Sequence, residues 1–121
     1  MTQTVNASAY DLQRVHRLGY IADTRDSVRV EFRAVLGFGE TLQSVTWQSE
    51  DREIVSIISA AIDETGTSAI LYSPRDGESY IRAKATTSAG RELSQYMWVQ
   101  TKGGVFDDGQ TAGQETVTVT V

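Results

Sequence analysis

The chain has 121 residues, a formal net charge of −5, a pI near 4.7 and no cysteine. A chain of this length can bury one core without staples, and the absence of thiols excludes a disulfide framework, a thiolate metal site and a cysteine nucleophile. The 11 basic residues are scattered, so nothing favours a nucleic-acid partner. We see neither a signal peptide nor a membrane-spanning apolar run, and we therefore expect no membrane association.

The N-terminal residues 1–22 are predicted to form an arm or an edge strand. Within them, residues 10–22 fit two interpretations. Leu12, Val15 and Leu18 have the spacing of a helical turn, whereas the polar and apolar residues also alternate as on a strand. A strand or a short irregular segment is the favoured interpretation.

The clearest strand is predicted over residues 27–35. Apolar and charged residues alternate there with a period of two, which indicates a sheet with one buried face and one wet face. The residues expected to point into the core are Val28, Val30, Phe32 and Ala34.

A second strand is predicted over residues 42–49, with Val45 and Trp47 on its inner face. A charged turn follows, and the β-branched residues at 54–58 favour a short strand. Residues 60–67, rich in small and polar side chains, are expected to be a connection.

Three more strands complete the predicted sandwich, over residues 68–73, 78–87 and 91–101. In the middle one, Ile81 and Ala83 alternate with basic residues and are expected to face the core. Gly and Asp turns separate the strands at short intervals, as in sandwiches and barrels.

Residues 103–121 are predicted to be a Gly-rich loop followed by a C-terminal strand. In that strand Val117, Val119 and Val121 alternate with threonine. An isolated strand is not stable in water, so it must pair either with this domain or with a neighbouring chain. The three valines are therefore interface candidates, and an ordinary last strand of the same sandwich is the alternative.

These elements predict an all-β fold, an immunoglobulin-like β-sandwich of about seven or eight antiparallel strands with extended N- and C-terminal arms, and residues 23–102 would be the sandwich domain. The extended arms would be residues 1–22 and 103–121. Trp47 on a central strand fits the buried tryptophan of such sandwiches, and the missing cysteine pair excludes an antibody-type domain.

Little in the sequence indicates a catalytic site or a metal site. His16 is the only histidine, and no Gly-x-Ser-x-Gly elbow accompanies it, so we expect no catalytic residues and no enzyme activity. Asp107 and Asp108 are a weak candidate for calcium binding because their oxygens suit that ion, but Asp-Gly is also ordinary turn chemistry. No cofactor is expected.

Aromatic side chains are the other candidate site. Tyr72, Tyr80, Tyr96 and Trp98 could form an exposed platform for a protein or a glycan. Tyr96 and Trp98 share one face of their strand and the neighbouring apolar residues share the other, so one of the two pairs must face away from the core. We therefore expect a partner interface at Tyr96 and Trp98.

Several segments together resemble the bacterial Ig-like (Big) domains, over roughly residues 27–101. They are Gly39–Leu42, Val45–Asp51, Ile54–Ile57 and Gly77–Ala83. The continuation Ala85–Arg91 looks like small Ig-like proteins of tailed phages, including fibre-tail adaptors.

That resemblance implies a non-enzymatic structural protein of a tailed-bacteriophage virion, assembled in the host cytoplasm. It would be an adaptor or decoration subunit that binds capsid or tail proteins, and a homo-oligomer, because virion parts occur in symmetric copies. The departures from adhesin-type Big domains, namely no repeats, secretion signal or anchor, favour the free-standing phage type. The alternative is a carbohydrate or cell-surface binding module.

Overall fold

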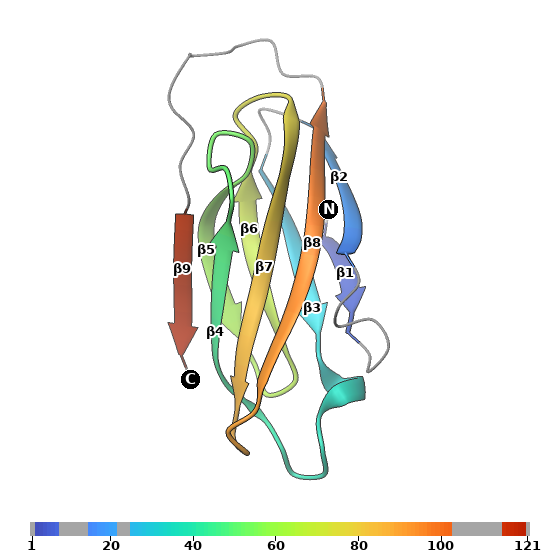
Figure 1. The fold of residues 1–121 in the computed structure, drawn as a ribbon, viewed down its shortest axis with the longest axis vertical. Coiled ribbons are helices and arrows are strands. Elements are labelled where there is room, and N and C mark those ends of the chain that lie inside the picture. Colours follow the sequence, from blue (N-terminus) through green and yellow to red (C-terminus); the bar gives the residue numbers. More distant parts are fainter. Residues whose placement is uncertain (1, 8–14, 22–24, 103–114, 121) are drawn as a thin grey trace.

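The computed structural model describes residues 2–7, 15–21, 25–102 and 115–120, which form two β-sheets packed face to face (Figure 1). The described residues contain one 3-10 turn, η1 (Arg33–Val35), and no helix that is long and apolar enough to cross a membrane. The strands in chain order are β1 (Thr2–Asn6), β2 (Val15–Ile21), β3 (Arg25–Glu31), β4 (Leu42–Ser49), β5 (Ser56–Ile62), β6 (Gly66–Tyr72), β7 (Gly77–Thr87), β8 (Glu92–Lys102) and β9 (Glu115–Thr120).

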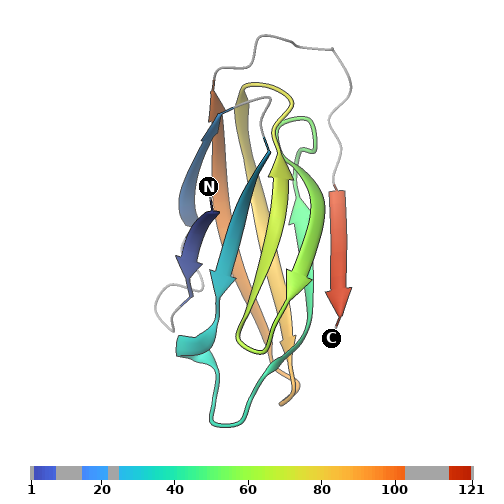
Figure 2. The same ribbon diagram turned by 180° about the vertical axis from the view of Figure 1, so that it is seen from behind.

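The strand order confirms the predicted all-β, immunoglobulin-like sandwich. One sheet has four strands in the order β1-β3-β6-β5, and the other has five in the order β2-β8-β7-β4-β9. Figures 1 and 2 show the two layers from opposite sides. The predicted count of seven or eight strands was too low, because β1 and β2 are both regular strands of these sheets.

The prediction that all strands are antiparallel was also wrong. β1 pairs in parallel with β3, and β2 pairs in parallel with β8. The N-terminal segment thus runs along one edge of each sheet in turn, and the Gln3 side chain donates a hydrogen bond to the Gly19 carbonyl at 2.8 Å, which links the two edges. Alternation in a sequence reports which face a side chain takes and says nothing about the direction of the neighbouring strand.

The core lies between the sheets, and Trp47 is at its centre. All seven predicted core residues are at most 1% exposed: Val28, Val30, Phe32, Val45, Trp47, Ile81 and Ala83. The indole N–H of Trp47 on β4 donates to the hydroxyl of Thr67 on β6 at 3.0 Å, and that hydroxyl donates to the carbonyl of Ala61 on β5 at 2.7 Å. A buried polar chain therefore joins the two sheets.

The strand predicted over 27–35 ends earlier, at Glu31. Phe32 remains buried, and its N–H still donates to the Thr65 carbonyl at 2.8 Å, but its backbone (φ −101°, ψ 1°) has left the extended region. The next three residues form η1, where Ala34 is exposed rather than inward. The chain turns here to leave the sandwich, and the alternation continues by coincidence into the turn.

The connection predicted over 60–67 is in fact the end of β5 and the start of β6. Only three residues separate the strands. The Asp63 carboxylate accepts hydrogen bonds from the N–H groups of Thr65 and Gly66 at 3.0 and 2.8 Å, which closes this tight turn. Conversely, Ile54 was predicted to lie in a strand but is buried in the turn before β5. Small residues carry too little apolar signal to be recognised as a strand.

The C-terminal strand pairs within its own chain. β9 runs antiparallel to β4 with Val117 opposite Trp47 and Val119 opposite Val45. Both valines are half-buried and pack against the core. Of the two alternatives, the structure thus has the ordinary last strand of the sandwich. Val121 and most of the Gly-rich loop, residues 103–114, lie outside the described residues.

We predict that Trp47→Phe lowers the free energy of unfolding by about 2 kcal/mol, since it removes one buried hydrogen bond of about 1 kcal/mol and leaves a void. Urea denaturation followed by circular dichroism measures the change. The matched control is Trp98→Phe on the outer face, where we expect a change within about 0.5 kcal/mol. Equal effects of the two substitutions would contradict the central position given to Trp47.

We also predict that a chain ending at Lys102 is less stable than the full chain. Half-burial of two valines contributes about 1.5–3 kcal/mol in total, and the β4 edge would lose its partner strand. The same urea titration tests this, with Val119→Ala in the full chain expected to reproduce a part of the loss. If truncation left the stability unchanged, β9 would not belong to this sheet in solution.

Candidate functional site

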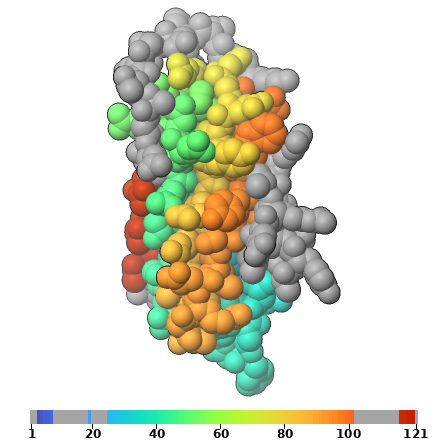
Figure 3. Space-filling view, viewed as in Figure 1, coloured from blue at the N-terminus to red at the C-terminus, as the bar shows by residue number. Residues whose placement is uncertain are grey.

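The outer face of the five-stranded sheet carries the candidate site. β7 is 11 residues long, and its side chains alternate between the core and the surface. Ile81 and Ala83 are buried, so Glu78, Tyr80 and Arg82 must project outward. The side chains of β7 and β8, yellow to orange, make up much of the front surface in Figure 3.

Tyr80 and Trp98 form a stacked aromatic pair on this face. They lie directly opposite each other on β7 and β8, with ring centroids 6.3 Å apart and an interplanar angle of 20°. Tyr80 is 47% exposed. Such a cross-strand pair stabilises the sheet by only about 0.2–1 kcal/mol, and it keeps a large apolar area in contact with solvent.

The next row of the same face pairs a cation with an aromatic ring. Arg82 lies opposite Tyr96, with its guanidinium carbon 5.9 Å from the ring centroid. Arg82 also donates a hydrogen bond to the side-chain oxygen of Gln48 on β4. Because the ring and the amide both hold the guanidinium, this long side chain has a defined position on the sheet. We call Tyr80, Arg82, Tyr96 and Trp98 the aromatic site.

Two depressions flank Tyr80 at the aromatic site. One has a volume of about 380 Å³ and is lined by Glu50, Asp51, Glu78, Ser79, Tyr80 and Trp98. The other, about 410 Å³, lies on the β4 side, where its lining includes Gln48, Glu50, Tyr80, Arg82, Tyr96 and Thr116. Tyr80 and Glu50 line both, so the two depressions adjoin.

The turn after β4 forms one wall of both depressions and is firmly attached to β7. The N–H of Glu50 donates to the Tyr80 carbonyl at 3.0 Å, and the N–H of Asp51 donates to the Ser79 hydroxyl at 3.1 Å. The Asp51 carboxylate in turn accepts from the N–H of Glu53 at 2.9 Å. The carboxylates at the rim therefore stand on a backbone with fixed geometry.

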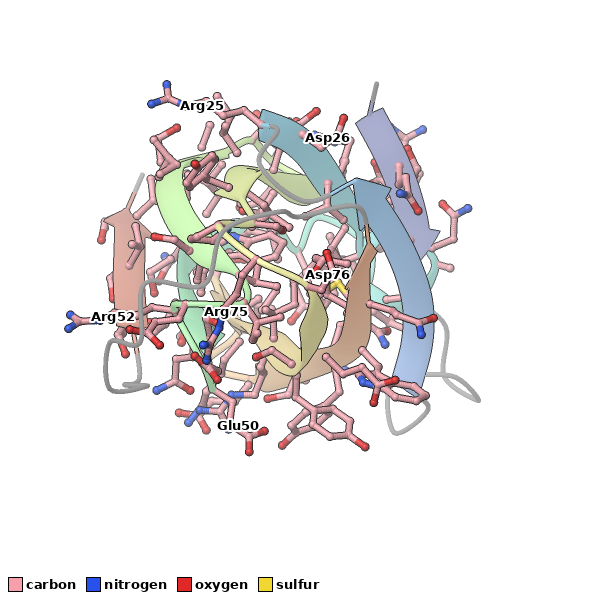
Figure 4. The ribbon with its side chains drawn as sticks, turned by 90° about the horizontal axis from the view of Figure 1, so that it is seen from above. Arg25, Asp26, Glu50, Arg52, Arg75 and Asp76 are labelled. Carbon is pink, nitrogen blue, oxygen red and sulfur yellow. The ribbon has the colours of Figure 1, made fainter. Side chains whose placement is uncertain are left out.

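A buried ion pair supports this end of the sandwich from inside. Glu53, which is 6% exposed, lies 3.3 Å from Arg75 in the turn between β6 and β7. Viewed from above, Glu50 projects outward from this end, whereas Arg75 lies further in (Figure 4). Removing one partner of a buried pair leaves an uncompensated charge, so the two turns depend on each other.

This arrangement is suited to binding. It offers aromatic faces, one guanidinium and several carboxylates on a rigid sheet. Among the described residues no group of three or more His, Cys, Asp or Glu could hold a metal ion. His16 lies on β2 at the register position of Met97, but its side chain lies outside the described residues, as do the calcium candidates Asp107 and Asp108.

The structure brings together three of the four aromatic residues that the sequence singled out. Tyr96 and Trp98 face outward with Tyr80, whereas Met97 is buried. Tyr72 is on β6 and belongs to the other sheet. Sequence reasoning missed Arg82, Gln48 and the acidic rim. The alternation in β7 already placed Glu78 and Arg82 beside Tyr80, but the contribution of β4 depends on strand pairing.

A second surface feature lies at the opposite end, in the loop between η1 and β4. Phe38 is fully exposed at its tip, and the turn is closed by the Glu40 N–H donating to the Gly37 carbonyl at 3.0 Å. Gly39 has φ +74°, a conformation that a side chain would strain.

The Glu40 carboxylate holds this loop to the β7–β8 turn. It accepts hydrogen bonds from Arg91 at 2.6 and 3.0 Å, from the Gly37 N–H at 2.7 Å and from the Thr87 hydroxyl at 2.5 Å. Arg91, the backbone of Gly37 and Thr87 together lower the pKa of Glu40 from an ordinary 4.5 to about 2. The charged form of Glu40 is thus part of the folded loop.

Comparison with known proteins identifies the fold and does not identify a function. No protein-family model matches the chain, and no curated protein sequence matches it either. Among solved structures, the chain is similar to the cysteine protease inhibitor EhICP2 from Entamoeba histolytica. The TM-score is 0.50 with 12% sequence identity, and the match covers 84% of this chain and 95% of that one. At this identity the likeness supports an Ig-like β-sandwich alone.

We predict that Glu40→Gln flattens the acid side of the stability profile. The folded-state pKa of Glu40 is depressed, so its contribution is fully present above pH 4.5 and is lost as the pH falls towards about 2. The pKa values of Asp63 and Glu31 are also lowered, so these two carboxylates lose their contribution to stability over the same acid range. The Glu40→Gln variant should therefore keep a residual slope of stability against pH. Urea titrations across this pH range, with exposed Glu92→Gln as the control for charge removal, measure it. An unchanged slope in Glu40→Gln would contradict the role of the carboxylate.

Proposed function

We propose that the chain is a non-enzymatic binding subunit that docks on a protein partner through the aromatic site. In the setting that the sequence resemblance implies, it is an adaptor or decoration subunit of a tailed-phage virion, and its partners are capsid or tail proteins. The Ig-like sandwich is its rigid carrier.

The single observation that carries this proposal is the row of exposed aromatic side chains beside two depressions. Tyrosine, tryptophan and arginine are the residue types enriched at the energetic centres of protein interfaces. Here Tyr80, Tyr96 and Arg82 occur together on a face that the described strands leave uncovered. Exposed aromatic surface contributes little to the stability of a monomer. A partner that covers this surface removes it from water, and the burial contributes binding free energy.

The phage setting rests on the continuation Ala85–Arg91, which looks like small Ig-like proteins of tailed phages. The segments Gly39–Leu42, Val45–Asp51 and Gly77–Ala83 resemble the bacterial Ig-like (Big) domains more widely. In the structure these segments form the turn before β4, β4 itself and the first half of β7. They therefore contain Tyr80 and Arg82 of the aromatic site and the neighbouring Gln48, as well as core positions.

A carbohydrate-binding module is the second candidate, and one observation favours it. The stacked rings of Tyr80 and Trp98 stand beside the carboxylates of Glu50 and Glu78 in one depression. Aromatic faces with a few polar groups are a common arrangement for small ligands in concave sites. Arg82 and Tyr96 do not line this depression, so a sugar bound there would leave half of the aromatic site uncovered, and we place this candidate second.

Binding to virions tests the proposal. Particles of a tailed phage assembled without this subunit should bind the purified chain. Trp98→Ala should weaken binding by about 30-fold, the loss typical of a hot-spot residue that contributes 2 kcal/mol. Lys84→Ala, on the same outer face of the sheet but outside both depressions, is the matched control and should bind as the wild type.

Equal binding of Trp98→Ala and the wild type would overturn the assignment of the site. If the particles do not bind the chain and a glycan array does, with the signal lost in Trp98→Ala, the carbohydrate candidate replaces the protein partner. Because Trp98 lies on the outer face, the substitution should leave the fold intact, which circular dichroism checks.

A further inference from the structure

We propose that the outer edge of β9 pairs with the same edge of a second copy of this chain, antiparallel about a two-fold axis. The two five-stranded sheets would join into one continuous sheet. This inference goes beyond the proposed function and does not depend on the aromatic site.

β9 is the last strand of its sheet. Its pairing with β4 uses one edge, and no further strand follows it in the described sheet order. Figures 1 and 2 both show β9 at one side of the molecule. A strand in this position presents a row of backbone donors and acceptors, which form a template for another strand.

The other edge strands of the described sheets differ from β9. β1 and β2 are linked by the hydrogen bond from Gln3 to the Gly19 carbonyl. β5 has a register irregularity between Ile57 and Ser59, and a bulge of this kind disturbs edge pairing. β9 pairs with β4 over six residues without interruption, and residues 116–120 contain neither charge nor proline. Residues 116–120 of β9 thus have no charge, proline or bulge, which are the usual protections against edge pairing. β1 lacks them too, but it is linked to β2 through Gln3.

The sequence of β9 is also complementary to itself. Thr116, Thr118 and Thr120 are exposed, whereas Val117 and Val119 are half-buried towards the core. In antiparallel pairs, opposite residues share a face, so a joined sheet must place threonine opposite threonine and valine opposite valine. A two-fold axis at Thr118 satisfies this condition, with Val117 opposite Val119 of the second copy. β-branched pairs of this kind are favourable across strands.

The expected complex is reversible. Five residues of each copy, 116–120, pair about this axis over roughly 17 Å, so the buried area is below that of a standard stable interface. The net charge of −5 on each copy opposes association, and salt should therefore strengthen it. Residues 116–120 carry no charge, so the paired edges themselves add no repulsion.

Light scattering of the full chain at increasing concentration tests the proposal, since the mass should rise from 13.3 kDa towards twice that value. Thr118→Lys places like charges opposite each other and should raise the dissociation constant at least tenfold. Thr46→Lys is the matched control. The two threonine hydroxyls are hydrogen-bonded to each other at 3.1 Å, so both substitutions remove the same bond, but Thr46 lies on the interior strand β4. Thr46→Lys should therefore still dimerise.

A mixture of Thr118→Lys and Thr118→Glu should recover dimers that neither variant forms alone, because the opposed charges now attract. A wild type that stays monomeric at every concentration and salt level would overturn the proposal, as would a dimer that survives Thr118→Lys. Should Thr118→Lys fail to fold, hydrogen exchange on the wild type decides the matter: amide protection in β9 should rise with concentration. Trp98→Ala should dimerise normally, and its failure to do so would place the contact at the aromatic site instead.

Discussion

The hydrogen bond from the Trp47 indole to the Thr67 hydroxyl is the contact on which the rest of the structure depends. It crosses the space between the sheets at a position with no access to water, and Thr67 extends it to the Ala61 carbonyl. Strands β4, β5 and β6 are thereby held in one relative position. A buried polar group must be satisfied, so an alternative register would lose this bond and expose part of the core.

That register also creates the aromatic site. Once Ile81, Ala83 and Met97 are committed to the core, their neighbours on β7 and β8 have to face outward. The long antiparallel pair then places Tyr80 directly opposite Trp98 and Arg82 directly opposite Tyr96. The site is thus the outer side of the longest strand pair in the described sheets. This gives it a rigid backbone, and little conformational entropy remains to be lost when a partner binds.

The two proposed contacts use different parts of one sheet. The aromatic site lies on β7 and β8, whereas self-pairing uses the edge of β9 on the other side of β4. Thr116 connects them, because it belongs to β9 and also lines the depression on the β4 side. A second copy at β9 would therefore stand next to that depression without covering Tyr80. A subunit that joins a copy of itself and a different protein has the two surfaces that an adaptor needs.

The sequence by itself determined which segments are strands and which face of each is buried, because a period of two is a local property of the chain. Val28, Val30, Trp47 and Ile81 could be assigned to the core in this way, and the pattern in β7 placed Tyr80 on the outside. The prediction failed at the small residues of β5, where the local signal was weak, and at the turn after Phe32, where the alternation continued by coincidence. Only the tertiary structure decided which strands are neighbours, that β1 and β2 run parallel to theirs, and that Gln48 and Glu50 stand beside Tyr80. Strand pairing joins residues far apart in the chain through backbone hydrogen bonds, which are the same for every side chain and therefore leave no mark in the sequence.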